Sequence, residues 1–333
     1  MRKFLFKIIG FASFPILCLV LIEMGIFILR PIIMSEQNLN NIFTAVSKNY
    51  SWMKKIKSNS IILLTGSSSV RYGLSCSMLN DLSKDSSNFL NLAWDARDPV
   101  ETYFLIKNLD LQNVKEIYFG LDPWIYAKRY YKHRNHFLYL DFNFIEALFY
   151  NYNYDESCLK KRYISFFRYF IKGEVDRMNI HNKDVIPEDY GSLTLNENPS
   201  NFGEPIENWF QTEKYGWSKL QFEYLAKIEI FCQNKKINFA VFIPPKRSDY
   251  SQRYRYDCTA IHKEFIENLK AVNFSAPIFG SYDQLDKKGD YSLFVDPYHL
   301  NMIGQKIYSS IFFEMMKSKK GKFDKTYYWF SQK

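Results

Sequence analysis

The chain has 333 residues, 47% hydrophobic and 18% aromatic, so it can bury a sizeable core, and one domain with an insertion is favoured over two domains. Its formal net charge of +9 suits an anionic partner such as a cell-wall polymer, lipid head groups or nucleic acid, or else reflects a lysine-rich proteome. Because the lysines are scattered and no stretch resembles a nucleic-acid-binding module, we expect no nucleic-acid partner.

The N-terminal segment is predicted to be an uncleaved membrane anchor. Residues 8–29 are apolar apart from Ser13 and Glu23, a stretch long enough for a transmembrane helix. The basic residues before it favour a cytoplasmic N-terminus, which places the rest of the chain outside the cytoplasm. A cleaved signal peptide is the alternative, but no small-residue cleavage site follows the segment. Glu23 would either contact a membrane partner or reach water near the outer interface.

Further along the chain, strands and helices are expected to alternate, which is the pattern of a parallel sheet with helices on both faces. The expected strands cover residues 61–64, 88–93, 114–124 (with the exit from the strand), 237–243 and 277–280. The expected helices cover residues 74–82, 100–109, 217–233, 256–272 and 302–316.

The alternation breaks between residues 128 and 216, which indicates an insertion. Three clusters within it are rich in aromatic residues, at 129–134, 149–154 and 166–170, and the first and last of them also carry basic residues. Sugars present apolar faces to aromatic rings, so the insertion could be a lid or a carbohydrate-stacking surface. The alternative is an insertion with a small core of its own.

A serine-rich turn, Gly66-Ser67-Ser68-Ser69, follows the first expected strand. In an open α/β sheet, ligands bind at the carboxyl ends of the strands. A serine at the start of a helix also lies among free backbone N–H groups, which can hold an oxyanion. Taken alone, the turn is equally consistent with a structural cap or a phosphate-binding loop.

A second motif, Asp296-Pro297-Tyr298-His299, precedes the last expected helix. An aspartate and a histidine three residues apart can place the carboxylate beside one imidazole nitrogen and leave the other nitrogen free to take a proton. With Ser68 as nucleophile, the two motifs predict a catalytic triad of Ser68, His299 and Asp296. The alternative for Asp296 and His299 is a surface turn that caps the last helix.

Together, Gly66-Ser67-Ser68 and Asp296-x-x-His299-Leu300-Asn301 resemble the first and last sequence blocks of SGNH/GDSL hydrolases, over roughly residues 58–318. In layout the chain is similar to the membrane-anchored, SGNH-like proteins of cell-envelope polymer acylation, such as the lipoteichoic-acid D-alanylation and alginate-acetylation proteins. The resemblance implies an α/β fold, a flavodoxin-like three-layer sandwich with a parallel sheet, plus an N-terminal transmembrane helix and a middle insertion.

The chain is accordingly expected to divide into four parts. These are a cytoplasmic tip and anchor at residues 1–34, a stalk or lead-in at 35–57, an SGNH-like domain at 58–320 with its insertion at about 128–216, and a C-terminal tail at 321–333.

The resemblance also implies an oxyanion hole made of the Ser68 N–H, a glycine N–H and an asparagine amide. Ala96 stands at the glycine position and Asp122 at the asparagine position. An ionised Asp122 would repel an oxyanion. Either burial keeps Asp122 protonated, or another group donates to the oxyanion, or the protein is a weak or inactive member of the family. The alternative is a structural role in which Asp122 caps the turn before Pro123. Asp122→Asn is expected to preserve or raise activity.

These features predict serine-dependent acyl transfer or ester hydrolysis on a cell-envelope glycan or polymer, with a membrane-bound acyltransferase as a potential partner. The alternative is a non-catalytic, glycan-binding or scaffold subunit of such an acyltransferase. A phosphate-binding flavodoxin-like domain would leave the Asp-x-x-His motif unexplained. We expect no metal or organic cofactor, because the histidines are scattered and the five cysteines lack metal-ligand spacing.

Overall fold

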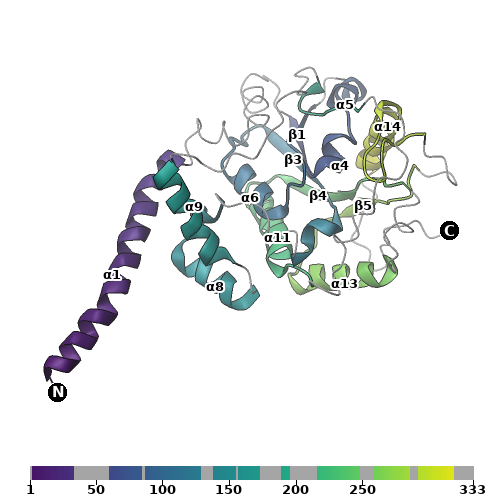
Figure 1. Ribbon diagram of the computed structural model, residues 1–333. Coiled ribbons are helices and arrows are strands. Elements are labelled where there is room, and N and C mark those ends of the chain that lie inside the picture. The colour runs from purple at the N-terminus through teal and green to yellow at the C-terminus, as the bar shows by residue number, and fades with distance from the viewer. Residues whose placement is uncertain are drawn as a thin grey trace. The chain divides into compact units, whose positions relative to one another are not determined.

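The computed structural model (Figure 1) describes residues 2–33, 60–84, 87–128, 138–154, 157–172, 189–195, 216–247, 258–285 and 292–318. The chain forms two compact units, one made of Met1–Thr44 and Asn135–Ile180 and the other of Ala45–Arg134 and His181–Lys333. The expected stalk, the aromatic and basic cluster at 129–134 and the expected tail lie outside the described residues.

The larger unit is built on a five-stranded sheet whose strands all run parallel, in the order β2-β1-β3-β4-β5. The strands are β1 (Ile61–Gly66), β2 (Asn88–Asn91), β3 (Val114–Gly120), β4 (Asn238–Ile243) and β5 (Ile278–Gly280). Every residue of β1 is buried, as expected of a continuous apolar run in a parallel sheet covered on both faces. The expected α/β fold with a parallel sheet is confirmed.

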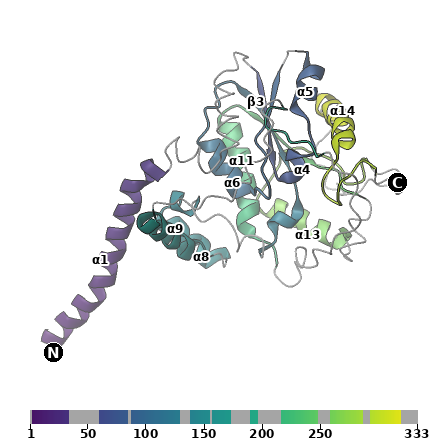
Figure 2. The ribbon, with the colours of Figure 1, turned by 45° about the horizontal axis from the view of Figure 1, so that its top comes forward.

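Helices cover both faces of this sheet (Figures 1 and 2). One face carries α5 (Cys76–Ser83) and α14 (Met302–Ser318). The other carries α6 (Pro99–Lys107), α11 (Lys219–Asn234) and α13 (Cys258–Ala271). Aromatic rings fill the space under α14, where the ring centroids of Phe242 and Phe312 are 4.9 Å apart. Full burial of one such ring contributes about 1.5–3 kcal/mol, so this layer holds α14 firmly on the sheet.

The strand order reverses between β1 and β3, because the chain passes from β1 to β2 on one side and then crosses to β3 on the other. At such a reversal the loops at the carboxyl ends of the strands separate and leave a crevice. The turn after β1 leads at once into the short helix α4 (Ser68–Arg71), and the turn after β3 carries Asp122. The serine-rich turn therefore lies where an open α/β sheet places its ligands.

The smaller unit combines the N-terminal helix with the insertion. Helix α1 (Arg2–Ile33) contains one segment, Ser13–Ile32, that is long and apolar enough to cross a membrane, a property it shares with signal sequences. The insertion supplies η2 (Leu138–Asp141), α8 (Phe144–Tyr154) and α9 (Cys158–Lys172).

The insertion has buried residues of its own, among them Phe142 and Tyr150, whose ring centroids are 5.5 Å apart. Part of it also packs on α1, because a shared core joins Ile26 of α1 to Leu140 of η2 and Phe166 of α9. Glu23 likewise has a partner within the chain, Arg162 of α9. A role as lid or sugar-stacking surface stays a prediction.

Candidate active site

Ser68 is the first residue of α4, directly after the buried strand β1. Ser67 caps this helix, and its hydroxyl accepts a hydrogen bond from the Ser69 N–H at 3.3 Å. Ser67 and Ser69 are buried, whereas Ser68 is half-buried. The turn therefore holds three adjacent hydroxyls differently and leaves that of Ser68 the most accessible.

Two glycines allow α4 to lie this close to the sheet. Gly66 ends β1 and pairs in register with Gly120 at the end of β3. Gly66 has φ +135°, and a Cβ there would come within 2.8 Å of the Gly120 carbonyl oxygen. A Cβ on Gly120 would lie 2.0 Å from Cγ2 of Val70 in α4. Only glycine fits both positions, so these residues fix the position of Ser68 above the strand ends.

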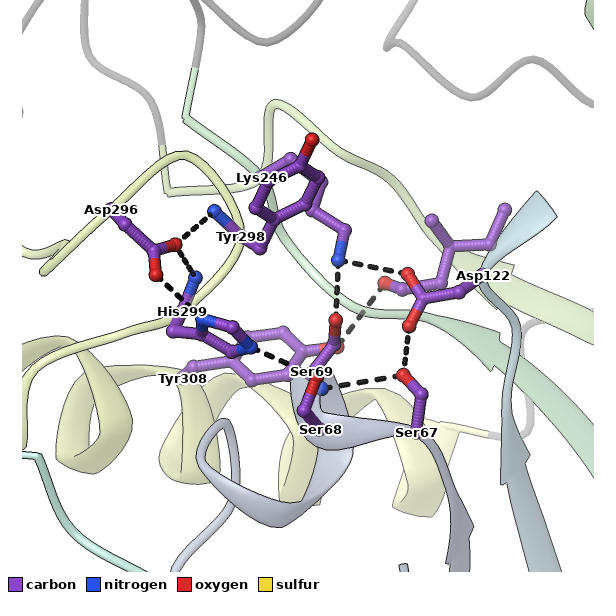
Figure 3. Close-up of polar contacts among 10 residues, drawn as sticks. Ser67, Ser68, Ser69, Asp122, Lys246, Asp296, Tyr298, His299 and Tyr308 are labelled. Carbon is purple, nitrogen blue, oxygen red and sulfur yellow. Dashed lines mark hydrogen bonds and ion pairs between the residues drawn. The ribbon is translucent and has the colours of Figure 1, made fainter. Parts of the chain in front are cut away.

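The Asp-x-x-His motif forms a tight turn before α14 (Figure 3). Oδ1 of Asp296 accepts hydrogen bonds from the N–H groups of Tyr298 at 2.7 Å and His299 at 2.9 Å. Its Oδ2 lies 2.7 Å from His299 Nδ1. The start of α14 is capped by Asn301, whose Oδ1 accepts from the Gly304 N–H at 3.0 Å. The alternative in which Asp296 and His299 serve to cap the last helix was therefore wrong.

His299 connects the two motifs. Its Nε2 lies 2.9 Å from Ser68 Oγ, within the hydrogen-bond range expected for a nucleophile and its base, although the two residues are 231 positions apart (Figure 3). The imidazole edge also packs on Tyr72 at the end of α4, with 5.2 Å between ring centroids. Asp296, Ser68 and Tyr72 thus orient the ring on three sides.

The charge state of Asp296 fixes the direction of the proton relay. Burial alone would raise the pKa of this carboxyl, but the hydrogen bond and charge of His299 and the charge of Lys246 outweigh it and hold the pKa below its ordinary value. An ionised carboxylate can only accept, so His299 Nδ1 carries the hydrogen. In the neutral imidazole Nε2 is then left to accept the Ser68 hydroxyl proton, and the imidazolium so formed is the species that the Asp296 carboxylate stabilises.

Asp122 forms an ion pair with Lys246, a residue that sequence reasoning missed. Lys246 Nζ lies 2.8 Å from Asp122 Oδ1, and both side chains are 0% exposed. Ser67 donates its hydroxyl to Asp122, and Lys246 donates to the hydroxyl of Ser69 (Figure 3). Within the turn, Ser68 therefore contacts His299, whereas Ser67 and Ser69 bond to the buried ion pair.

The structure corrects the interpretation of Asp122 as a cap. Asp122 does occupy the N-cap position of the 3-10 helix η1 (Pro123–Tyr126), but its side chain makes no capping hydrogen bond. The ammonium of Lys246 balances its negative charge instead. The position of Lys246, three residues after β4 ends, was the available signal, because parallel strands bring their carboxyl ends to one edge of the sheet.

Ala96 lies in the turn after β2, which is tied to the serine turn. Trp94 donates its N–H to the Gly66 carbonyl at 3.0 Å, and Arg71 of α4 forms an ion pair with Asp95, with Nη1 and Oδ2 3.2 Å apart. Ala96 has φ +58°, in the left-handed region that glycine adopts most readily. The alanine therefore keeps a glycine-like backbone at this position.

The backbone N–H of Ser68 is the donor best placed for an oxyanion. Among the residues that the structure describes, it donates to no protein acceptor, whereas the N–H groups of Val70 and Arg71 both bond to the Ser67 carbonyl. Since it belongs to the attacking residue itself, it lies beside any tetrahedral centre formed on Ser68 Oγ.

Across the described ranges, no group of three or more histidine, cysteine, aspartate or glutamate side chains has the arrangement of a metal site. Four of the cysteines, Cys18, Cys76, Cys158 and Cys232, are free thiols. No protein-family model matches the chain, and a search of curated proteins finds no relative.

Proposed function

We propose that this chain is a membrane-anchored, SGNH-like serine enzyme that transfers or hydrolyses an acyl ester on a cell-envelope glycan or polymer. The observation that carries the proposal is the continuous relay from Ser68 Oγ through His299 to Asp296, with contacts of 2.9 Å and 2.7 Å. The parallel sheet with strand order 2-1-3-4-5, which flavodoxin-like folds share, supports the SGNH-like fold.

In the proposed reaction, Ser68 Oγ attacks the carbonyl carbon of the acyl ester while its proton passes to His299 Nε2. Asp296 holds Nδ1–H and stabilises the imidazolium that forms. The tetrahedral intermediate collapses as His299 returns the proton to the departing alcohol, which leaves the acyl group on Ser68. Water or an acceptor hydroxyl then attacks this acyl-enzyme by the same steps, giving hydrolysis or transfer respectively.

Lys246 offsets the negative charge that Asp122 would otherwise place near the oxyanion. The Asp122 carboxylate is neutralised by a buried ammonium and so does not present a bare negative charge to an oxyanion. An ammonium has three donors, and within the described residues Asp122 and Ser69 are the only oxygen partners of Lys246. Because this ammonium is buried, its effect on an oxyanion held by the N–H of Ser68 would be electrostatic.

The proposed location rests on α1. This helix is long and apolar enough to cross a membrane, and the basic residues at its start favour a cytoplasmic N-terminus. The α/β unit would then lie outside the cytoplasm, where envelope polymers are acylated. A reporter fused after Lys333 should be active only outside the cytoplasm, and activity inside would remove envelope polymers as substrates.

Labelling with a fluorophosphonate probe tests the proposed function. Such probes react with a serine only where a base and an oxyanion hole activate it. The full-length chain in detergent should be labelled on Ser68, as mapped by peptide mass spectrometry, and Ser68→Ala should lose the label. Ser310→Ala, which removes a serine hydroxyl on α14 remote from the relay, should label as wild type.

The competing function is a non-catalytic, glycan-binding partner of a membrane acyltransferase. That function predicts no label on Ser68 and no cleavage of small acyl esters in a folded protein that still binds an envelope glycan. Labelling of Ser68 together with ester turnover excludes it.

A further inference from the structure

Two ion pairs fasten the insertion to one side of α1. Arg162 of α9 reaches Glu23 with two nitrogens, of which Nε lies 3.0 Å from Oε1, and its side chain is 3% exposed. Two turns further along α1, Arg30 pairs with Asp141 of η2. Separating a buried pair leaves an uncompensated charge, so these contacts keep the insertion beside the C-terminal half of α1.

Apolar packing between the two pairs reinforces this attachment. Ile26, Leu140 and Phe166 form a small core, with Ile22 and Leu29 of α1 packed against it. Gly25 permits the close approach, since a Cβ at that position would lie 3.2 Å from Phe166 Cζ. Helix α9 is therefore in direct contact with α1 rather than bridged to it by a loop.

The contact lies within the segment of α1 that can cross a membrane. That segment runs from Ser13 to Ile32, and at 1.5 Å per residue Glu23 is about 14 Å from its C-terminal end. A hydrocarbon core is about 30 Å thick, so Glu23 would lie near the middle of the bilayer. The helices held there would occupy the leaflet that surrounds the C-terminal half of α1.

The insertion also has an apolar surface with nothing packed on it in the described residues. Four residues of α8 at helical spacing share one exposed face: Ile145, Leu148, Phe149 and Tyr152. Three residues of α9 do the same: Phe167, Phe170 and Ile171. Soluble surfaces rarely expose so many large apolar side chains on two neighbouring helices, so these two helix faces, which we together call the α8–α9 face, indicate an interaction site.

Lipid is the partner we infer for the α8–α9 face, because the neighbouring helix α1 would itself be surrounded by lipid. Phe27 and Ile28 of α1 are 76% and 64% exposed at the level of the ion pairs, and in a membrane they would meet acyl chains. Asp141 of the insertion pairs with Arg30 at that same level. A groove of about 680 Å³ between α1 and the insertion continues the apolar surface, with Val20, Met24 and Phe144 among its walls, and would be filled by acyl chains.

We propose that α8 and α9 form a hairpin embedded in one leaflet of the membrane, with the α8–α9 face toward the lipid acyl chains. Neither helix is long enough to cross, because 11 and 15 residues extend only about 17 Å and 23 Å. As helices, both satisfy their backbone hydrogen bonds internally, as the hydrocarbon core demands. The anchor is thus a helix plus a re-entrant hairpin, locked by Glu23 and Arg162.

The start of α8 is capped by its own first turn. Asn143 Oδ1 accepts from the Glu146 N–H at 2.8 Å, and Glu146 Oε2 accepts from the Asn143 N–H at 3.0 Å. This reciprocal pair satisfies two backbone donors that would otherwise be left open at a helix start. The proposal depends on α1 crossing the membrane and is independent of the chemistry of Ser68.

Spin-label accessibility in lipid vesicles tests the hairpin. The full-length protein, with Cys18 and Cys258 replaced by alanine so that the remaining thiols are buried, is labelled at Phe149→Cys or Phe170→Cys and placed in phosphatidylcholine–phosphatidylglycerol vesicles. Collision rates with oxygen, which concentrates in hydrocarbon, and with a water-soluble nickel chelate are then measured by power saturation.

Two matched positions calibrate the measurement. A label at Phe27→Cys reports the lipid-facing side of α1, and one at Ile230→Cys reports an exposed apolar residue of the α/β unit. We expect the labels at 149 and 170 to collide with oxygen and not with the chelate, as at 27, whereas the label at 230 should show the reverse.

Three results would overturn the proposal. Chelate collisions at 149 and 170 equal to those at 230 would place the hairpin in water. Immobilised labels that neither reagent reaches would mean that a protein, and not lipid, covers the α8–α9 face. Chelate access at Phe27 itself would remove the membrane span on which the hairpin depends. Labelling of Ser68 by the fluorophosphonate would be unaffected in each case, so the two proposals fail separately.

Discussion

Removing one partner of the Lys246–Asp122 ion pair should destabilise the α/β unit more than removing both partners. Each side chain is fully buried, and the two charged atoms are 2.8 Å apart. Asp122→Asn leaves an ammonium without a counter-charge, and Lys246→Met leaves a carboxylate with only a serine hydroxyl. The double variant removes both charges and leaves polar and apolar groups of similar volume.

The size of the effect follows from the geometry of the pair. At 2.8 Å and an effective dielectric constant of about 20, the Coulomb attraction is about 6 kcal/mol. The cost of desolvating both charges cancels much of this attraction, but it is not recovered when one charge stays behind, so each single variant should lose about 3–5 kcal/mol. Replacing the whole pair should be nearly neutral, within about 1–2 kcal/mol of wild type.

Thermal unfolding of the detergent-solubilised chain, followed by the fluorescence of its tryptophans, measures the effect. In a unit of this size, 1 kcal/mol shifts the Tm by about 2–4 °C, so each single variant should melt roughly 6–20 °C below wild type. The double variant should recover most of that loss. From the structure we expect Asp122→Asn to lower activity, in contrast to the expectation from sequence that it preserves or raises activity. The reason is that Lys246 should move once its counter-ion is lost.

Strictly additive losses in the double variant would refute this reasoning, since they would mean that the two charges do not interact. An unchanged Tm for Asp122→Asn would refute it as well. In that case the asparagine would act as the resemblance to SGNH hydrolases implies, and ester turnover should equal or exceed that of wild type.

Three further predictions follow from the site. Because Asp296 has a lowered pKa, its carboxylate stabilises the fold at pH values above the ordinary carboxyl pKa, and this contribution is lost as pH falls through the lowered pKa. Asp296→Asn should therefore flatten the acid limb of a curve of stability against pH. The same variant should lower kcat about 10³–10⁴-fold. Ala96→Gly should raise stability by about 1 kcal/mol in a melting experiment, by relieving a left-handed alanine, and a lower Tm would contradict this. Gly120→Ala should cost about 1–3 kcal/mol and weaken labelling of Ser68, because the new Cβ would collide with Val70, and wild-type labelling would show that α4 can shift without consequence.

The fold was largely predictable because each strand has a local signature. Residues 61–64 form an unbroken apolar run, and residues 237–243 form another that ends at Pro244, so buried strands could be placed within a few residues. The helix over 302–316 was equally visible from its apolar spacing. The spacing of apolar residues and the positions of prolines and glycines are local properties of the chain, so they can be read from a single sequence.

The site was predictable only where a short motif carries the chemistry. Asp296 and His299 are three residues apart, so their mutual contact is encoded locally. Asp122 and Lys246 are far apart in the sequence although they follow neighbouring strands, β3 and β4, and apart from its place just after a strand nothing distinguishes Lys246 from the other lysines of a basic chain. The attachment of the insertion to α1 was missed for the same reason, because residues in contact there are separated by more than a hundred positions.

The Glu23–Arg162 pair also bears on how the protein is made. Its two residues lie 139 positions apart, so a ribosome adding 5–20 residues per second produces the arginine about 7–28 s after the glutamate. If α1 crosses the membrane as proposed, it enters throughout that interval with an uncompensated carboxyl near the middle of the span, at a cost of about 3 kcal/mol. Its phenylalanines, leucines and isoleucines, at about 0.3–0.6 kcal/mol each, must outweigh that cost unaided. In the proposed anchor, membrane insertion would therefore depend on the hydrophobicity of the helix alone, and the ion pair would form only after residues 138–172 have been translated.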